Sequence, residues 1–374
     1  MKVYLQVPLS SYSGYGNDGI GITEAFMRLG ADVHLAPTHI QPPISAEILS
    51  LMTKTAVAPF DLVISHVDPG VLSVNAGTSQ GSLVTVGWTM WESSTFANVP
   101  GTDKELSENY ENFDVLVGYD KITSSNLEKY FDGPVITVQG GFDPEEWVYY
   151  DRDWHSEDFY FSMIGVLSPR KNPFLAIQAF SELRAEHKDF EKHARLMLKT
   201  TAPGLHSKME DVYPGLRIFY DMWDTDTVKE FYRNTHVLLA PSLGEGKNMP
   251  CLEFMSTGGP VIATNWGGMA EWLDPAFSYP LNDYTMGPAV PISPGAEQAY
   301  VNVEDLKTQM LRVFRNRNEA REKGYQASQI IPQIRSWDSV IDRLMLQLKD
   351  AAPNGSELYS KYKMLDRGGR RDDA

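Results

Sequence analysis

Apolar residues recur along the chain in short runs, and longer amphipathic segments separate these runs. Each run is long enough for one buried strand, whereas the segments between them carry apolar residues at helical spacing. The expected strands are residues 3–7, 31–35, 61–66, 83–87, 113–118, 134–138, 159–166, 194–199, 216–219, 237–240 and 261–264. The expected helices are 20–29, 122–131, 174–186, 227–234, 303–327 and 337–348. Strands that alternate with helices form parallel sheets, so the pattern predicts an α/β chain with two doubly wound units.

The expected domain boundaries follow from this alternation. It restarts after residues 143–158, which are dense in Asp, Glu, Trp and Tyr and which we interpret as a linker. We therefore expect domains at 1–150 and 151–330, and a length of 374 residues is comfortable for two domains. Amphipathic spacing predicts a C-terminal helix within 331–352, and the mixed charge that follows predicts a flexible tail over 353–374.

The composition excludes several classes of protein. The chain has 42% hydrophobic residues and a net charge of −16, so it is neither disordered nor suited to a general electrostatic grip on DNA or an anionic membrane. Cys251 is the only cysteine, which excludes an intramolecular disulfide and fits a reducing compartment. There is no apolar run of membrane-spanning length and no signal-peptide pattern at the start. We therefore expect a cytoplasmic protein without a membrane span.

Residues 237–264 carry the most informative chemistry, because their pattern predicts a strand, a loop, a helix and a second strand. Glu245 lies in the loop between two glycines, and Glu253 lies in the first turn of the helix. In doubly wound folds such a loop lies at the carboxyl edge of the sheet, where ligands bind. A carboxylate there can accept hydrogen bonds from sugar hydroxyls, while backbone N–H groups meet negative charge. The alternative is a solvated loop glutamate and a helix-start glutamate favoured by the helix dipole alone.

Two more connections between a strand and a helix are candidates for anion binding. Arg170 and Lys171 are adjacent cations just before a helix, which predicts an anion site, with a solvated charge pair as the alternative. Gly14 and Gly16 follow the first strand, the usual position for approach to a phosphate, with a plain turn as the alternative. Their spacing lacks the dinucleotide fingerprint, so we do not expect a nicotinamide cofactor.

Aromatic and polar residues at other strand ends suggest an acceptor site. Trp91 and Glu92 follow a strand, and an indole face can stack on a sugar while a carboxylate binds its hydroxyls; a core aromatic cluster is the alternative. His66 ends another strand and is a candidate to line the site, with a packing histidine as the alternative. Asp224 and Asp226 imitate a metal-binding D-x-D, but they precede a helix, so we interpret them as capping residues and expect no catalytic metal.

The sequence EGKNMPCLEFMSTGGPVIATNWGG, residues 245–268, closely resembles the E-x7-E segment of retaining glycosyltransferases with two Rossmann-like domains (the GT-B fold), especially family 4. The resemblance implies that Glu253 binds the nucleotide ribose and that Glu245 contacts the donor sugar. It also implies that the loop containing Met222 holds the nucleotide base. Further donor contacts are expected from Gly14, Gly16, Gly246, Lys247, Asn248 and Met249.

The resemblance also assigns the cations and the acceptor side. The family places an arginine and a lysine against the donor diphosphate, and Lys171 matches the lysine. Val166 occupies the usual arginine position, which makes Arg170 the candidate substitute. The pair Trp91–Glu92 resembles a variant found in some family 4 enzymes, whereas many relatives have a histidine near this position. Glu92 is therefore the candidate acceptor contact.

The expected function is a retaining transfer of a sugar from a nucleotide-sugar donor to a hydroxyl acceptor, with no metal or cofactor. The resemblance implies a central cleft between the two domains and a C-terminal helix that crosses back onto the first domain. The acceptor class stays open between a glycan, a small molecule, a protein and modified DNA. One alternative is a same-fold glycosyltransferase of hydroxymethylated pyrimidines in DNA, which needs an extruded base. Another is a nucleotide-sugar-binding protein with weak catalysis.

Overall fold

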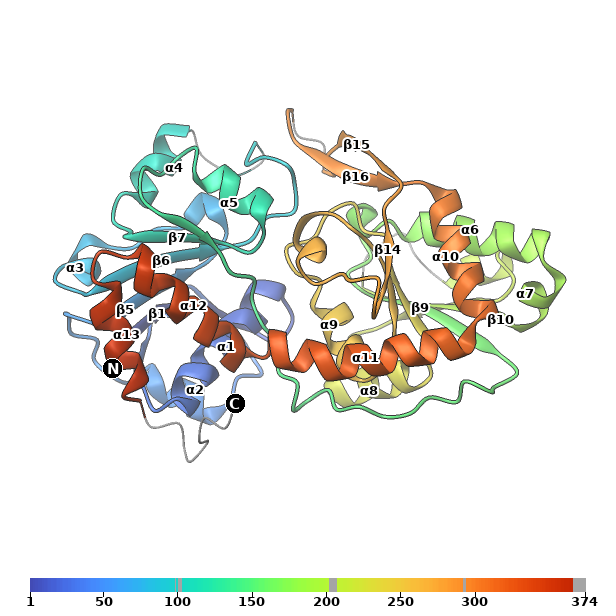
Figure 1. Ribbon diagram of the computed structural model, residues 1–374, viewed down its shortest axis with the longest axis horizontal. Coiled ribbons are helices and arrows are strands. Elements are labelled where there is room, and N and C mark those ends of the chain that lie inside the picture. Colours follow the sequence, from blue (N-terminus) through green and yellow to red (C-terminus); the bar gives the residue numbers. More distant parts are fainter. Residues whose placement is uncertain (98, 100–102, 202–206, 292–293, 366–374) are drawn as a thin grey trace. The chain divides into compact units, whose positions relative to one another are not determined.

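The computed structural model describes residues 1–97, 99, 103–201, 207–291 and 294–365 (Figure 1). The chain divides into two compact units. Unit 1 comprises residues 1–142 together with the chain from 335 onward, and unit 2 comprises residues 143–334. Unit 1 is therefore built from both ends of the sequence. The boundaries expected from the sequence were 150/151 and 330/331.

Unit 1 contains a six-stranded parallel sheet in the order β3-β1-β5-β6-β7-β8. Its strands are β1 (Lys2–Gln6), β3 (Asp32–Leu35), β5 (Leu62–His66), β6 (Val84–Thr89), β7 (Val115–Gly118) and β8 (Val135–Thr137). A small parallel pair joins β2 (Pro8–Ser10) to β4 (His39–Gln41). The helices are α1 (Gly14–Arg28), α2 (Ala46–Leu51), α3 (Ala76–Ser79), α4 (Asp103–Tyr110), α5 (Lys121–Leu127), α12 (Trp337–Ala351) and α13 (Gly355–Lys363), with a 3-10 turn η1 (Pro69–Val71).

Helices cover both faces of the unit 1 sheet, which explains why its central strands β5, β6 and β7 are buried along their whole length. One core joins the sheet to α1, α2, α12 and α13, and these helices lie on one face in Figure 1. A second core joins the other face to α4 and α5. Helix α12 packs so closely on α1 that a Cβ added at Gly21 would lie 1.9 Å from the indole nitrogen of Trp337.

Two expectations for unit 1 were wrong. The predicted flexible tail at 353–374 contains α13, because Leu358 and Tyr362 are fully buried in the same core as α12; residues 366–374 lie outside the described part of the chain. The first helix was expected at 20–29 but begins at Gly14, since the Ser13 side chain accepts a hydrogen bond from Gly16 N and caps it earlier. Gly14 and Gly16 therefore lie in the first turn of a helix and not in a loop.

Unit 2 contains a second six-stranded parallel sheet, in the order β11-β10-β9-β12-β13-β14. Its strands are β9 (Phe159–Gly165), β10 (Ala194–Thr200), β11 (Leu216–Tyr220), β12 (Val237–Ala240), β13 (Val261–Thr264) and β14 (Tyr279–Leu281). An antiparallel hairpin follows, formed by β15 (Tyr284–Pro288) and β16 (Glu297–Val301). The helical segments are α6 (Pro173–Glu186), α7 (Lys188–His193), α8 (Thr225–Arg233), α9 (Met249–Ser256), α10 (Val303–Arg315), α11 (Arg317–Arg335), η2 (Pro169–Lys171), η3 (Ser207–Asp211) and η4 (Gly267–Glu271).

The unit 2 sheet is also covered on both faces. Helices α6, α7, α10 and α11 contribute to one core with the sheet. On the other face, α9 contacts β12 and β13, and Phe231 of α8 packs edge-on against Phe219 of β11. The helix expected over 303–327 is divided, because Asn316 leaves the helical conformation and its side chain caps the last turn of α10 by donating to Arg312 O at 2.9 Å.

The segment interpreted as a linker is packed onto unit 2 through one buried arginine. The Arg152 guanidinium donates to Thr235 O at 2.9 Å and to Thr257 O at 2.8 Å. It also lies over the rings of Tyr150 and Phe254. Because these contacts satisfy a charged group that is costly to bury, the residues after 142 belong to unit 2. Among the described residues, no helix is long and apolar enough to cross a membrane.

Candidate functional site

Three charged side chains meet at the carboxyl edge of the unit 2 sheet. Glu245 lies on the connection that follows β12, and Arg170 and Lys171 lie on η2, which follows the neighbouring strand β9. Glu245 Oε2 is 2.9 Å from Arg170 Nη1, and Glu245 Oε1 is 2.7 Å from Lys171 Nζ. Leu243 N also donates to Arg170 O at 2.8 Å, which ties the two connections together through the backbone. The structure therefore brings these predicted residues into one cluster.

The charge of this cluster is unbalanced. Burial alone would raise the pKa of Glu245, but the fields of Arg170 and Lys171 and their hydrogen bonds outweigh it and hold the pKa at about 2. Glu245 is therefore ionised at neutral pH, although it is only 4% exposed. Two cations against one carboxylate leave one excess positive charge, and both cationic side chains keep some exposure to solvent. Such a cluster can attract an anion.

Glu253 has a different environment from Glu245. It is nearly buried on α9, and its Oε2 accepts a hydrogen bond from the Tyr232 hydroxyl at 3.0 Å. Burial raises the pKa of Glu253 to about 7, and the hydrogen bond from Tyr232 and the charge of Lys247 only partly oppose this rise. One glutamate is thus held as a carboxylate by cations, whereas the other is close to its titration point at neutral pH.

The connection that carries Glu245 is locked by η4 behind it. Gly268 N donates to Glu245 O at 2.9 Å, and a Cβ added at Gly268 would lie 1.9 Å from Gly246 O. Lys247 is buried, and its carbonyl oxygen accepts from the Trp272 indole at 2.9 Å. These contacts hold the connection in one conformation before any ligand binds, which is the property that a preorganised site needs.

Asn248 and Met249 connect this segment to α9. Asn248 adopts a left-handed conformation with φ of 62° immediately before the helix, and its side-chain amide donates to Met269 Sδ at 3.5 Å. Met249 is half-buried and opens the helix, and Pro250 stands where no intrahelical donor is required. The left-handed residue turns the chain sharply from the Glu245 connection into the helix that carries Glu253.

A second group of residues lies at the end of β11 and β10. Met222, a predicted donor contact, is 57% exposed on the connection that follows β11. The neighbouring Trp223 packs against the rings of Phe219 and Phe231 at centroid distances of 5.4 Å each. The Asp224 side chain accepts from Thr227 N at 2.8 Å, which confirms the helix-capping interpretation of the apparent D-x-D. Among the described residues, no group of three or more His, Cys, Asp or Glu could hold a metal ion.

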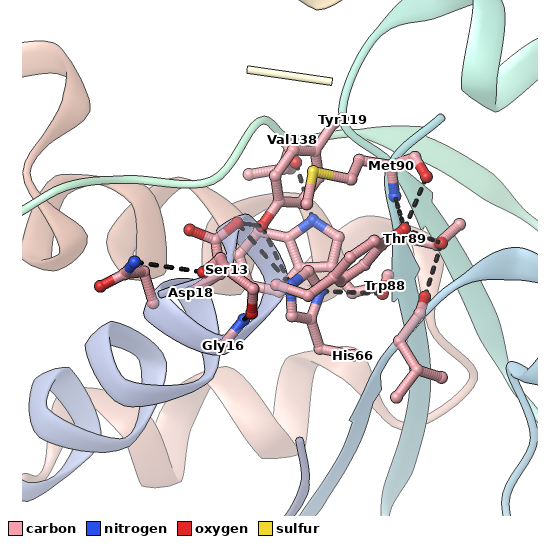
Figure 2. A network of polar contacts seen from close by, with 12 residues as sticks. Ser13, Gly16, Asp18, His66, Trp88, Thr89, Met90, Tyr119 and Val138 are labelled. Carbon is pink, nitrogen blue, oxygen red and sulfur yellow. Dashed lines mark hydrogen bonds and ion pairs between the residues drawn. The ribbon is translucent and has the colours of Figure 1, made fainter. Parts of the chain in front are cut away.

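The other predicted residues belong to unit 1, where His66 lies in a buried polar network (Figure 2). His66 is fully buried at the end of β5, with Nδ1 2.9 Å from Trp88 O. The Tyr119 hydroxyl donates to Asp18 Oδ2 at 2.7 Å, and His66 Nε2 lies 3.8 Å from the same oxygen. This geometry favours the packing interpretation of His66. Sequence reasoning missed Asp18 and Tyr119, because their partners are more than fifty residues away.

A tyrosine between the two predicted glycines joins α1 to the end of β6. The Tyr15 hydroxyl lies 2.6 Å from Met90 O, to which it donates, and 3.2 Å from Thr89 Oγ1. Met90 leads directly into Trp91 and Glu92, both of which stay partly exposed. The Trp91 indole donates to Thr95 O at 2.8 Å and packs edge-on against Phe96. The α1 start and the candidate acceptor segment are therefore held together.

A constraint on space also explains one of these glycines. A Cβ added at Gly16 would lie 2.4 Å from Ser10 O and 2.6 Å from Ser10 N, whereas one added at Gly14 would meet only the end of Met90 at 3.5 Å. Gly16 is thus required for the close approach of α1 to β2, independently of any ligand. Gly14 carries no such requirement.

Residues 158–285 match the family described as "Glycosyl transferases group 1". A D-inositol 3-phosphate glycosyltransferase of Acidothermus cellulolyticus is 29% identical over 115 residues, which cover 28% of this chain and 26% of that protein. The match thus spans about a quarter of that relative's length.

Several solved structures have a similar fold. The sucrose-phosphate synthase of Thermosynechococcus elongatus is similar with a TM-score of 0.63 at 13% identity, over 94% of this chain and 100% of that one. The trehalose-6-phosphate synthase OtsA has a TM-score of 0.65 at 11% identity, over 93% and 99%. HepE of Anabaena, solved in complex with UDP and glucose, has a TM-score of 0.58 at 12% identity, over 93% and 99%.

Two parallel-sheet units and a group 1 domain in the second of them define a glycosyltransferase of the GT-B class. The group 1 match and the similarity to a D-inositol 3-phosphate glycosyltransferase support a family 4-like type, in agreement with the resemblance found in the E-x7-E segment.

Proposed function

We propose that this glycosyltransferase transfers a sugar from a nucleotide-sugar donor to a hydroxyl acceptor, with retention of configuration and without a metal or cofactor. The observation that carries the proposal is the cluster of Glu245 with Arg170 and Lys171 and its excess positive charge. A nucleotide sugar needs cations to bind its anionic diphosphate and a carboxylate to accept hydrogen bonds from its sugar hydroxyls, and the cluster supplies both. HepE, a protein of similar fold, binds UDP and glucose, which supports this donor class.

The chemistry of donor cleavage fits the two cations. When the glycosidic bond breaks, negative charge builds on the oxygen of the leaving diphosphate. Cations fixed nearby stabilise this charge without reorganising during the reaction, and such electrostatic stabilisation is usually a large contribution. Arg170 and Lys171 take this role in the proposal, and they supply the positive charge for which other enzymes use a divalent ion.

The two glutamates divide the recognition of the donor in this proposal. Glu245 is ionised and accepts hydrogen bonds from the donor sugar, in exchange for part of its contact with the cations. Glu253 accepts from the ribose hydroxyls, and ligand hydroxyl donors would favour its ionised form just as the Tyr232 hydroxyl does. We assign the acceptor contacts to Trp91 and Glu92. Retention is part of the proposal because the E-x7-E segment resembles that of retaining enzymes.

A mass-spectrometric screen of nucleotide sugars tests the proposal, since many transferases slowly release the donor sugar to water. We expect the wild-type protein to cleave at least one donor and Lys171→Ala to lower this rate by about 10²-fold or more. Lys188→Ala is the matched control, because that lysine is exposed on α7 and pairs with Glu191, which is exposed as well. An unchanged rate in folded Lys171→Ala would contradict the assigned role. A product of inverted anomeric configuration, determined by NMR, would contradict retention.

A further inference from the structure

A third lysine lies at the same sheet edge as the cations of the donor cluster. Lys199 is the penultimate residue of β10, a strand that pairs with β9 on one side and β11 on the other. The next residue, Thr200, accepts through its hydroxyl a hydrogen bond from Leu167 N at 3.1 Å, in the connection that leads to η2. Lys199 therefore stands between the connection that carries the two cations and the connection that carries Trp223.

The environment of Lys199 leaves its charge unsatisfied by the protein. The residue is only 9% exposed, yet no described residue forms an ion pair or a hydrogen bond with its ammonium group. The ammonium lies 5.5 Å from the ring centroid of Trp223, a favourable contact that uses none of its three N–H donors in a conventional hydrogen bond. Burial lowers the pKa of Lys199, and the nearby charge of Asp221 opposes this only in part. The N–H donors of this group are therefore available to a ligand.

The order of the strands indicates which part of a donor this lysine meets. Along β12, β9, β10 and β11, the edge presents first Glu245, then the two cations, then Lys199 and finally Trp223. A nucleotide sugar is elongated in the order sugar, diphosphate, ribose and base. Glu253 accepts from Tyr232 of α8, and the adjacent Phe231 packs on Trp223, so the ribose end of the proposed site continues toward Trp223. Lys199 therefore lies beyond the diphosphate cations, on the nucleoside side of the proposed site and beside Trp223.

We propose that Lys199 selects the base of the donor, by donating a hydrogen bond to the exocyclic oxygen of a keto base, at O4 of uracil or O6 of guanine. This inference rests on the proposed function, because it assumes a nucleotide in this site. An ammonium group has donors and no acceptor, so it pairs with a carbonyl oxygen and is opposed by an amino group. Cytosine and adenine carry amino groups at the corresponding positions, which makes them the disfavoured partners.

Equilibrium binding of nucleoside diphosphates to the full chain tests the proposal, with UDP against CDP and GDP against ADP as matched pairs. The site will accept either pyrimidines or purines. Within the accepted pair, we expect wild type to bind the nucleotide with the keto base (UDP or GDP) at least about tenfold more tightly than the one with the amino base (CDP or ADP). Lys199→Met should lose most of this ratio. Lys199→Arg, which keeps the charge and the N–H donors, should retain a clear preference.

Lys229→Met is the control variant. Lys229 also lies over a tryptophan ring in unit 2, at 5.9 Å from the centroid of Trp147, but it forms an ion pair with Glu146. The Lys229→Met variant should leave the UDP/CDP and GDP/ADP affinity ratios unchanged. A Lys199→Met variant that weakens all four nucleotides equally would overturn the proposal, since a phosphate contact or a structural role has that effect. If wild type binds none of the four, the nucleotide-sugar function itself fails, which is a different result.

Discussion

Replacing Glu245 by Gln removes one negative charge from between two cations and keeps the shape of the side chain. In the wild-type protein the cations hold the pKa of Glu245 at about 2, against an ordinary value of 4.5, despite the opposing effect of burial. A pKa shift of one unit corresponds to about 1.4 kcal/mol, so the folded structure stabilises the ionised form of Glu245 over its protonated form by roughly 3 kcal/mol. Gln cannot supply this gain, and it leaves Arg170 and Lys171 facing each other without a counter-charge. We expect the free energy of unfolding to fall by about 3 kcal/mol at pH 7.

The pH dependence of this difference has a defined sign. Because the pKa of Glu245 is lower in the folded than in the unfolded state, its contribution is complete above about pH 4.5. The contribution is lost as the pH falls toward 2, where both states bind the proton. The stability of wild type should therefore approach that of Glu245→Gln in acid.

Chemical denaturation of both proteins at pH 7, repeated at decreasing pH, measures this effect. Glu191→Gln is the control, because Glu191 pairs with Lys188 at 2.9 Å but both side chains are exposed, and such pairs contribute little. It should leave the denaturation midpoint nearly unchanged. A Glu245→Gln protein as stable as wild type at pH 7, with an unchanged circular dichroism spectrum, would refute the reasoning.

Three further predictions concern other parts of the structure. Burial raises the pKa of Glu253 to about 7, so the wild-type protein loses stability as the pH rises from 4.5 through 7. In denaturation experiments, the free energy of unfolding of Glu253→Gln relative to wild type should therefore increase by about 3 kcal/mol between pH 4.5 and 8. Leu358→Ala should cost about 2–5 kcal/mol, because Leu358 is fully buried, and an unchanged melting temperature would show that α13 is dispensable. Gly16→Ala should lower the melting temperature more than Gly14→Ala, because only its Cβ would meet the backbone of β2; an equal effect would contradict the packing role of Gly16.

Local patterns predicted the parts of the fold that local sequence controls. The apolar runs at 159–166 and 237–240 correspond closely to β9 and β12, because a parallel strand buried on both faces is apolar along its length. The start of α1 was missed because the surrounding residues are rich in glycine and serine, a composition that favours a turn. This composition outweighed the helix-capping signal of Ser13 in the sequence prediction. Helix α13 was missed because its few apolar positions gain their burial only from α12 and the unit 1 sheet.

The same distinction applies to the candidate site. Glu245, Arg170 and Lys171 could be proposed from sequence, because each follows a strand and the carboxyl ends of parallel strands meet at one edge. Lys199 also ends a strand, but only the structure shows that it is buried beside Trp223. The partner of Glu253, Tyr232, comes from another helix, and no spacing rule relates the two. Contacts between distant segments are what the pattern could not supply.

The division of unit 1 between the two ends of the chain has a consequence for biosynthesis. Residues 143–334 are continuous and can fold as soon as they leave the ribosome, whereas the first sheet must wait for α12 and α13 to cover one of its faces. Throughout synthesis of the second half, the nascent first half exposes an apolar surface that invites aggregation. A premature stop directly after residue 334 would therefore produce a chain whose later-made unit is complete while its earlier-made unit is not, and such a product is a target for chaperones and proteases.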